Sequence, residues 1–307
     1  MQTDKPSQTA RKVALNIVTL GSRRRMDEVL PPGIVDATAK LLVEAGAVGR
    51  WSVRFSRSRL AVGLYLAFDW MMPGQFEAFA HRKAFCERQV RKGIEGGASQ
   101  VLVLGAGYDT LGWRLAPELA GVNFFEIDHP ATARLKAKGI KAMGRPTNLH
   151  LIAEDLSERP LVDVLQVNPT WNSVSPTVIV AEGLLMYLPP TAVGTLFEQC
   201  GAISGAGSRI AFTYVGRLSN GRPDAGPWTG LVLWLLEVGG EPWLWSIPTE
   251  ELSAFLNAHD WTIPDGETEP SDRFGIEFYA TAVVTCKTPN QSLEGTPQTV
   301  SLSSTSE

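Results

Sequence analysis

A glycine turn that ends in an acid is the first stretch of this chain that could carry chemistry. The apolar residues 101–104 lead into Gly105 and Gly107, and Asp109 follows two residues later. Glycine lets the chain turn sharply and lets backbone N–H groups approach a ligand closely. A carboxylate inside such a turn repels a pyrophosphate but suits a ligand with positive charge. The turn therefore favours a cationic nucleoside over a dinucleotide, whose usual third glycine is Thr110 here.

Two more acids follow the next apolar run. Glu126 and Asp128 stand where residues 122–128 end. Ligands of open α/β sheets bind outside the carboxyl ends of the strands, where an acid can hold a pair of ribose hydroxyls. S-adenosylmethionine combines a ribose with a sulfonium, an ammonium and no phosphate, so it suits the turn and these acids together. A strand–helix turn that binds nothing, and a nucleotide-dependent oxidoreductase, are the alternatives.

The elements that would position these residues alternate between strand and helix. Parallel strands are predicted at the short apolar runs 101–104, 122–128, 148–153, 177–181 and 208–215, with helical segments between them. Residues 261–263 and 276–286 predict a closing antiparallel hairpin. This order predicts an α/β fold, a seven-stranded doubly wound Rossmann-like sheet.

The chain divides into three predicted parts. Residues 1–95 predict a helical cap, and residues 96–288 predict a nucleoside-binding core with a lid inserted at about 216–247. The polar residues 289–307 predict a disordered tail. Within the cap, residues 50–66 interleave four arginines with apolar residues. A nucleic-acid patch is one interpretation, and the favoured one is a helix whose arginines extend over an apolar face.

The overall composition narrows the class of protein. Hydrophobic residues make up 44% of the 307 residues, which is enough for a sizeable core. The net charge of −4 and the pI near 5.7 argue against nucleic acid as a partner. No apolar run is long enough to span a bilayer, and the three cysteines have no metal-site spacing. We expect a cytoplasmic protein with a small-molecule partner and no metal, membrane or nucleic acid, and we leave its oligomeric state open.

A series of short motifs gives the chain a family resemblance. The motifs are Leu-Pro-Pro-Gly at 30–33, Pro-Gly at 73–74, Arg-Lys at 82–83 with Glu87, the run 100–110, Phe-Glu-Ile-Asp-His-Pro at 125–130 and Ala-Glu-Gly-Leu-Leu-Met-Tyr-Leu at 181–188. In this order and spacing the chain resembles the leucine carboxyl methyltransferase family of S-adenosylmethionine-dependent O-methyltransferases, in particular its bacterial secondary-metabolite members. Gly112 and Trp113 depart from the basic-aromatic pair of the family, a change that can reshape the acceptor pocket.

The resemblance implies roles for individual residues. Arg82 matches the arginine that pairs with the methionyl carboxylate of the cofactor, and Glu182 matches an acid that faces its ammonium. Asp128 matches the acid that binds the ribose, and Asp155 with Leu156 matches the pair that frames the adenine. The predicted cofactor-binding residues are Arg82, Gly105, Ala106, Gly107, Asp109, Glu126, Asp128, His129, Asp155, Leu156 and Glu182.

The expected chemistry is a direct displacement at the methyl group. A carboxylate acceptor is ionised at neutral pH and needs no general base, whereas a hydroxyl acceptor needs one. The matched motifs offer no convincing base, so a carboxylate of a small molecule is the first choice. Tyr187 and Arg217 are the predicted acceptor-side catalytic residues, with Arg222 in the same loop as Arg217. A hydroxyl acceptor and a non-catalytic protein that binds S-adenosylmethionine remain alternatives.

Overall fold

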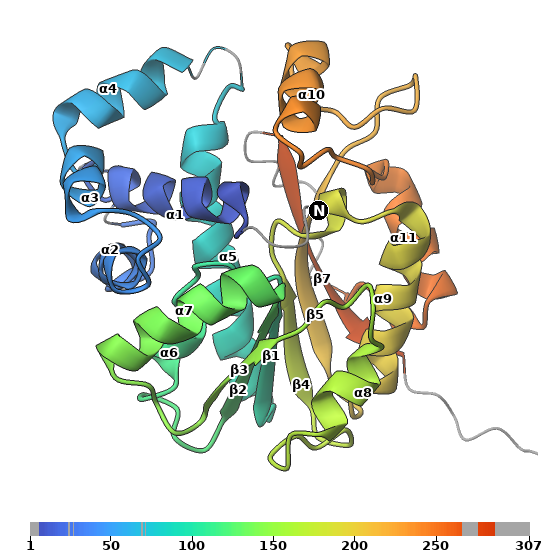
Figure 1. The fold of residues 1–307 in the computed structure, drawn as a ribbon. Coiled ribbons are helices and arrows are strands. Elements are labelled where there is room, and N and C mark those ends of the chain that lie inside the picture. The colour runs from blue at the N-terminus through green and yellow to red at the C-terminus, as the bar shows by residue number, and fades with distance from the viewer. Residues whose placement is uncertain are drawn as a thin grey trace, which may run out of the picture.

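The structure is a computed structural model that describes residues 6–23, 25–26, 28–68, 70, 72–265 and 276–285. Within these residues one seven-stranded sheet forms the centre of the molecule, in the strand order β3-β2-β1-β4-β5-β7-β6 (Figure 1). The strands are β1 (Gln100–Leu104), β2 (Asn123–Asp128), β3 (Leu149–Ala153), β4 (Thr177–Ala181), β5 (Arg209–Val215), β6 (Trp261–Thr262) and β7 (Glu277–Val284). The first five strands pair in parallel, and β7 runs antiparallel between β5 and β6. The predicted fold class, closing hairpin included, is confirmed.

The strand registers bring the carboxyl ends of the parallel strands to one edge. Leu104 of β1 lies opposite Ile127 of β2, and Val103 lies opposite Val180 of β4. Every residue of β1 is buried, because its alternate side chains enter two separate apolar cores on the two faces of the sheet. Acids and glycines that follow these strands in sequence therefore meet at a single edge.

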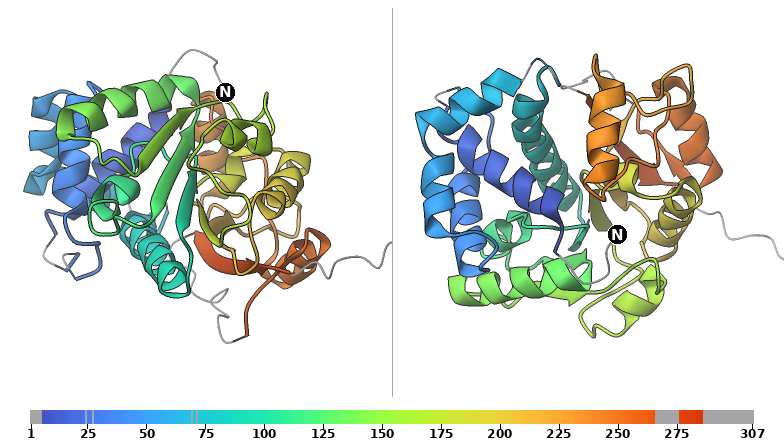
Figure 2. Two further views of the ribbon diagram at one scale, coloured as in Figure 1. Left: turned by 90° about the horizontal axis from the view of Figure 1, so that it is seen from below. Right: turned by 45° about the horizontal axis from the view of Figure 1, so that its top comes forward.

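Helices cover both faces of the sheet (Figure 2). Those before β1 are α1 (Gln8–Leu20), α2 (Ile34–Glu44), α3 (Arg50–Ser56), α4 (Arg59–Phe68) and α5 (Gln75–Glu95). Those after it are α6 (Leu111–Leu115), α7 (Pro130–Met143), α8 (Leu161–Gln166), the short 3₁₀ helix η1 (Leu185–Tyr187), α9 (Pro190–Ala202), α10 (Thr229–Val238) and α11 (Thr249–Ala258). The core of one face takes side chains from α1, α2, α5, α6 and α7, and that of the other from α8, α9 and α11.

Two predicted helices differ in extent for identifiable reasons. The single helix predicted over 50–66 is two helices, because the Ser58 hydroxyl accepts a hydrogen bond from the Ala61 N–H at 3.2 Å and so caps the start of α4. The helical segment predicted between the first two strands is limited to α6, since Pro117 lacks the N–H that its next turn would need. The predicted tail, residues 289–307, lies outside the described residues.

The predicted lid region contains one helix and a long return segment. The loop after β5 is held by a bridge between Arg217 and Pro223, and α10 follows it. The return segment then reaches the carboxyl edge, where the Leu244 N–H donates to the Met186 carbonyl at 2.6 Å. Among the described residues, no helix combines the length and the apolar character that crossing a bilayer requires.

Candidate active site

The glycine turn at the end of β1 is tightly held. Gly105 and Gly107 have φ angles of 64° and 46°, a backbone region that side-chain-bearing residues rarely adopt. The Gly107 N–H donates to Asp128 Oδ2 at 2.5 Å, which ties the turn to the end of β2. A Cβ atom on Gly105 would lie 3.0 Å from a Leu184 methyl group, and one on Gly107 would lie 3.1 Å from the Ala10 Cβ. The turn is therefore covered closely by Leu184, the residue before η1, and by Ala10 of α1.

Asp109 links the turn to α5 and α6. Its Oδ1 accepts hydrogen bonds from the N–H groups of Thr110 at 2.6 Å and Leu111 at 3.1 Å, and its Oδ2 lies 2.9 Å from Lys83 Nζ. Burial alone would raise the pKa of Asp109, but the nearby cationic groups, Lys83 foremost, hold it well below its usual value. Asp109 is therefore ionised at neutral pH.

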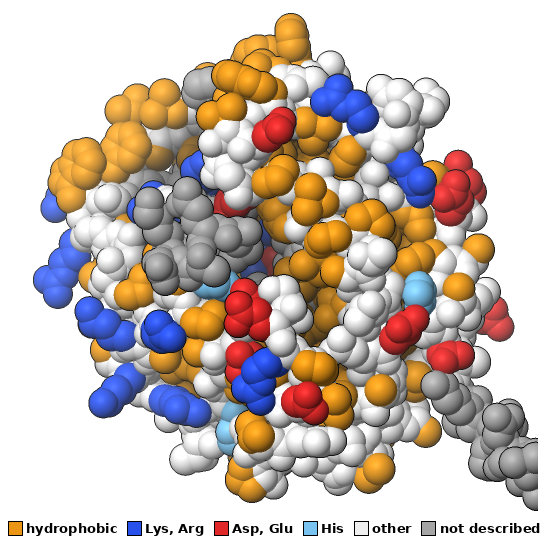
Figure 3. Space-filling view, turned by 45° about the vertical axis from the view of Figure 1, so that its right-hand side comes forward, with side chains coloured by type: hydrophobic (Ala, Val, Ile, Leu, Met, Phe, Trp, Pro, Cys, Tyr) orange, Lys and Arg blue, Asp and Glu red, His pale blue; other side chains and the backbone are white. Residues whose placement is uncertain are grey.

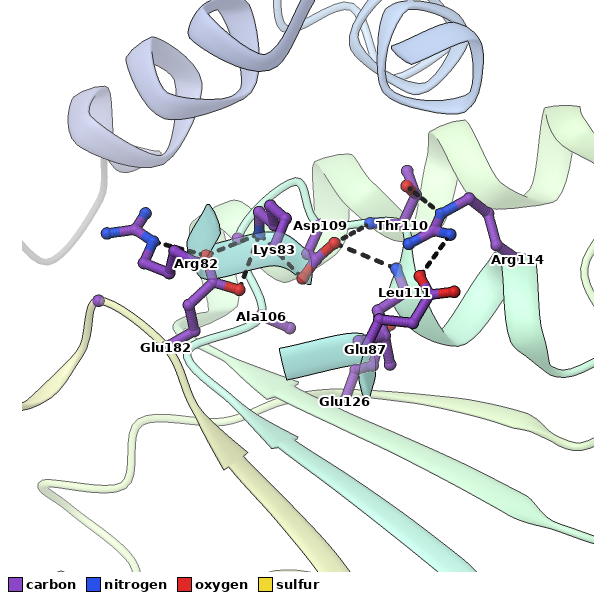
Figure 4. Close-up of polar contacts among 12 residues, drawn as sticks. Arg82, Lys83, Glu87, Ala106, Asp109, Thr110, Leu111, Arg114, Glu126 and Glu182 are labelled. Atoms are coloured by element: carbon purple, nitrogen blue, oxygen red, sulfur yellow. Dashed lines mark hydrogen bonds and ion pairs between the residues drawn. The ribbon is translucent and has the colours of Figure 1, made fainter. Parts of the chain in front are cut away.

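Five buried ionisable side chains meet beside this turn, and we call Arg82, Lys83, Asp109, Glu182 and Glu277 the charge cluster. Figure 4 shows the first four of them. Arg82 Nε donates to Glu182 Oε1 at 2.8 Å, and its Nη1 donates to both carboxylate oxygens of Glu277 at 2.9 Å. Lys83 Nζ lies 2.9 Å from Glu182 Oε1, so it bridges Glu182 and Asp109. Two cations and three carboxylates leave the cluster with one net negative charge.

The two cations of the charge cluster stay protonated despite their burial. Burial by itself lowers the pKa of the Arg82 guanidinium, and Glu277 and Glu182 more than offset this, so its pKa is raised. Burial likewise lowers the pKa of Lys83, and Asp109 and Glu182 raise it above its ordinary value. Arg82 and Lys83 are therefore positively charged at neutral pH.

Glu277 and Lys83 are members of the cluster to which the sequence analysis gave no role. Lys83 belongs to the Arg-Lys motif, but only its neighbour Arg82 has a matched partner in the family pattern. Glu277 is the only acid in the apolar residues 276–286, and an acid in a buried strand indicates a buried cationic partner. That signal could have identified Glu277 but not its partner.

Glu126 lies below the turn, within the core. Its Oε2 is 2.7 Å from Lys136 Nζ, and the same ammonium donates to the Ala106 carbonyl at 3.2 Å. Burial raises the pKa of Glu126, and Lys136 opposes this shift. A Cβ atom on Gly112 would lie 2.6 Å from Glu126 Oε1, so the glycine at this position leaves room for the carboxylate. These contacts support the turn, and they give no support to a direct cofactor contact by Glu126.

Asp128, His129 and Asp155 lie near the ends of β2 and β3. Partial burial raises the pKa of Asp128, and the Gly107 N–H bond works against that shift. His129 Nδ1 caps α7 by accepting from the Ala131 N–H at 3.4 Å, and its Nε2 lies 3.7 Å from Asp155 Oδ2. Asp155 also accepts hydrogen bonds from Ser157, and Leu156 packs against the adjacent core. The predicted ribose and adenine residues thus share one side of the site.

The predicted acceptor-side residues occupy two different settings. Tyr187 lies in η1, where burial raises the pKa of its hydroxyl. Arg217 instead pairs with Glu251 at 2.9 Å, and both side chains are exposed. Arg222 is exposed in the same loop. Trp113 donates its indole N–H to the Gly144 carbonyl at 2.9 Å, so its side chain is bonded to the residue that follows α7.

Hydrogen bonds from Ser7 and Thr9 hold the start of α1 against two other segments. The Ser7 hydroxyl donates to Glu241 Oε1 at 2.9 Å, and the Thr9 N–H donates to Glu241 Oε2 at 3.1 Å. The Ser7 N–H donates to the Thr132 hydroxyl at 3.0 Å. The start of α1 is therefore joined to α7 and to the segment that follows α10.

Comparison with known proteins places this geometry in a family. The model of the leucine carboxyl methyltransferase family matches residues 22–201. A relative from Mycolicibacterium paratuberculosis (strain ATCC BAA-968 / K-10), provisionally named an S-adenosyl-L-methionine-dependent methyltransferase, is 30% identical over 202 residues, which are 63% of this chain and 64% of the relative. One of the same provisional name from Mycobacterium tuberculosis (strain ATCC 25177 / H37Ra) is 30% identical over 182 residues, 59% of this chain and 58% of the relative.

The matched region is shorter than these relatives, and the structural likeness covers more of the chain than the sequence matches do. The chain spans less than two thirds of the length of either relative. A crystal structure from Thermobifida fusca YX, provisionally titled a methyltransferase, superimposes with a TM-score of 0.55 at 16% identity. It covers 85% of this chain and 97% of its own, which shows a shared fold. The family model matches more than half of the 307 residues, and the chain belongs to the leucine carboxyl methyltransferase family.

Proposed function

We propose that this chain is an S-adenosyl-L-methionine-dependent methyltransferase that methylates an oxygen of a small molecule, with a carboxylate as the first choice. The observation that carries the proposal is the charge cluster beside the glycine turn. Its single net negative charge suits a cofactor that is a zwitterion with one additional positive charge. A buried, uncompensated charge is costly, so a cationic ligand is the favoured complement of this edge.

The residues at the carboxyl edge fit the cofactor group by group. Arg82 would hold the methionyl carboxylate through the N–H groups that its bonds to Glu182 and Glu277 leave over, because a guanidinium has five N–H donors. Asp109 and Glu182 would face the ammonium, and Asp128 would accept from the ribose hydroxyls. A Cβ atom on Gly183 would lie 3.0 Å from Arg82 Nη1, so the glycine gives the guanidinium the room that this role needs.

The chain itself contributes alignment and exclusion of water. When bound, the cofactor supplies a methyl group on a sulfonium sulfur, and this sulfur becomes a neutral thioether when the methyl group passes to the acceptor oxygen. Leu184 and Ala10 cover the glycine turn closely, and Glu241 fastens the start of α1 above it. These contacts support a covered turn, at which alignment of the reactants and exclusion of water would raise the rate.

The ionisation of the nearby side chains favours a carboxylate acceptor. The raised pKa of Tyr187 keeps its hydroxyl protonated at neutral pH, so it is a poor general base. His129 uses Nδ1 to cap α7. A carboxylate is already ionised and needs neither group. An acceptor-side role for Arg217 would require its pair with Glu251 to open.

Cofactor binding and turnover can be tested in sequence. S-adenosylhomocysteine should raise the Tm, since a ligand at 100 times its Kd stabilises the native state by about 2.7 kcal/mol, and NAD should leave the Tm unchanged. Stabilisation by NAD alone would instead favour an oxidoreductase. A mass-spectrometric screen of carboxylic acids and phenols then detects the transferred methyl group. A methyl group that resists mild alkaline hydrolysis would be an ether and would exclude the carboxylate.

A further inference from the structure

Helix α10 is apolar around its whole circumference but is hardly buried. Its sequence is Thr-Gly-Leu-Val-Leu-Trp-Leu-Leu-Glu-Val, and Val232 is its one fully buried side chain. Leu231, Trp234, Leu235 and Val238 are exposed, Val238 to 68%. A helix of this composition normally lies in a protein core or in a lipid phase. Ten residues are too few to span a bilayer, so α10 suits an interface.

A second set of exposed apolar side chains lies on α3, on α4 and just after α4. The set consists of Trp51, Leu60, Leu64, Leu66 and Trp70. The Trp70 ring packs edge-on against Trp228, with centroids 5.0 Å apart, immediately before α10. Figure 1 and the right-hand view of Figure 2 place α4 and α10 on the same side of the molecule. Apolar side chains also gather at the top of the space-filling view (Figure 3).

Positive charge accompanies these apolar side chains. Residues 50–68 contain four arginines and no acid, although the whole chain has a net charge of −4. Arg50, Arg54 and Arg59 are exposed, and Arg57 pairs with Asp36 at 2.6 Å. Basic residues interleaved with Trp, Phe and Leu on a short helix are the pattern of helices that lie in the headgroup region of anionic membranes.

We propose that α3, α4 and α10 form a peripheral docking surface for an anionic lipid bilayer. The arginines would meet the phosphate headgroups, and Trp51, Leu64 and Trp234 would enter the boundary between headgroups and acyl chains. The aliphatic share of the surface favours lipid over nucleic acid, which binds through phosphate contacts and base stacking. This surface departs from the expectation of no membrane partner, and it does not depend on the proposed methyl transfer.

Vesicle flotation of the full chain tests the proposal. The protein should float with vesicles that contain phosphatidylglycerol and phosphatidylcholine, and should bind pure phosphatidylcholine vesicles much more weakly. Binding should fall at about 0.5 M NaCl, because salt screens the arginine–phosphate attraction. Changing Arg54→Gln and Arg59→Gln should each weaken binding about fivefold, the factor equivalent to about 1 kcal/mol per basic residue near an anionic surface.

Matched control variants test the apolar contribution and the arginine contribution separately. Trp234→Ser should reduce binding to anionic vesicles, and Val174→Ser should not, although Val174 is also apolar and is 78% exposed, in the turn that precedes β4. Arg134→Gln on α7 removes an exposed arginine outside this surface and should leave binding unchanged. Circular dichroism checks that each variant is folded.

Three results would overturn the proposal. One is the absence of flotation with anionic vesicles by a folded protein. Another is a stable dimer that Trp234→Ser dissociates, which would assign the surface to a second copy of the chain. The third is binding to single-stranded RNA that Arg54→Gln weakens while flotation stays unaffected, which would assign the arginines to nucleic acid.

Discussion

Glu277→Gln changes the charge of the buried cluster while nearly preserving its shape. The substitution removes one of three carboxylates, so the net charge of the cluster goes from −1 to zero. Arg82 keeps its 2.8 Å bond from Nε to Glu182, and a glutamine oxygen in the Oε1 position can still accept from Arg82 Nη1 and from Gln75 Nε2, whereas the bond from Nη1 to Oε2 is lost. The substitution therefore tests the charge of the cluster more cleanly than Arg82→Ala, which would leave two buried carboxylates without that partner.

The expected effect is a loss of discrimination between the methylated and demethylated cofactor. S-adenosylmethionine and S-adenosylhomocysteine differ by one methyl group and one positive charge. At a separation of about 10 Å and an effective dielectric constant of about 20, two unit charges interact by about 1.7 kcal/mol. Removing the negative charge of Glu277 should therefore reduce the ratio of the two affinities by roughly 15- to 20-fold, while affinity for S-adenosylhomocysteine changes less.

Isothermal titration calorimetry of both ligands measures this ratio for the native chain and the variant. Glu251→Gln is the matched control, since Glu251 is exposed and pairs with Arg217 outside the cluster. If Glu277→Gln weakens both ligands equally, the cluster acts only as a scaffold for Arg82, and the charge argument is wrong. If neither ligand binds the native chain, the proposed function fails instead.

Further predictions concern stability and rate. Gly112→Ala should destabilise the protein by about 1–3 kcal/mol through a clash with the buried Glu126 carboxylate, whereas Gly63→Ala, with open space around it in α4, should stabilise by about 0.5–1 kcal/mol in thermal unfolding. Asp128→Asn should leave the Tm of the free protein unchanged or higher at pH 7, because it removes a carboxylate whose pKa burial raises, and should abolish the S-adenosylhomocysteine shift. The lowered pKa of Asp109 provides stability above its unfolded value of about 3.9 that is lost as pH falls through the folded value, so Asp109→Asn should flatten the acid limb of a pH–stability curve. With a carboxylate acceptor the methylation rate should be flat from about pH 6 to 8, and a rate that climbs with pH would indicate a hydroxyl.

The sequence predicted the sheet because its strands are short, apolar and separated by clear breaks. Residues 101–104 and 177–181 are buried on both faces, so each appears as an uninterrupted apolar run. The two helices α3 and α4 were predicted as one, because periodicity extends across Arg57 and Ser58 and only a side-chain cap separates them. Boundaries set by a single hydrogen bond are poorly visible to patterns that average over a whole helical turn.

The site was predictable where its residues follow strands in the sequence. Gly105, Asp128 and Glu182 follow or end β1, β2 and β4, and the parallel topology alone brings them to one edge. Glu277 reaches that edge by a different route, because it begins the antiparallel strand β7 and enters the sheet from the opposite direction. The outward pairing of Arg217 with Glu251 depends on loop conformation, which sequence spacing does not determine.

Burying the charge cluster is an inefficient way to stabilise a fold. Buried ion pairs often contribute no more than apolar residues of similar volume would, because both partners lose their hydration. Arg82 and Lys83 are adjacent on α5, and the carboxylates they contact come from three separate segments after β1, β4 and at the start of β7. Packing alone would not require such an arrangement at one sheet edge. The cluster has one more carboxylate than it has cations, and in the proposed function a ligand with one positive charge would balance it. The affinity ratio of Glu277→Gln distinguishes that explanation from a purely structural one.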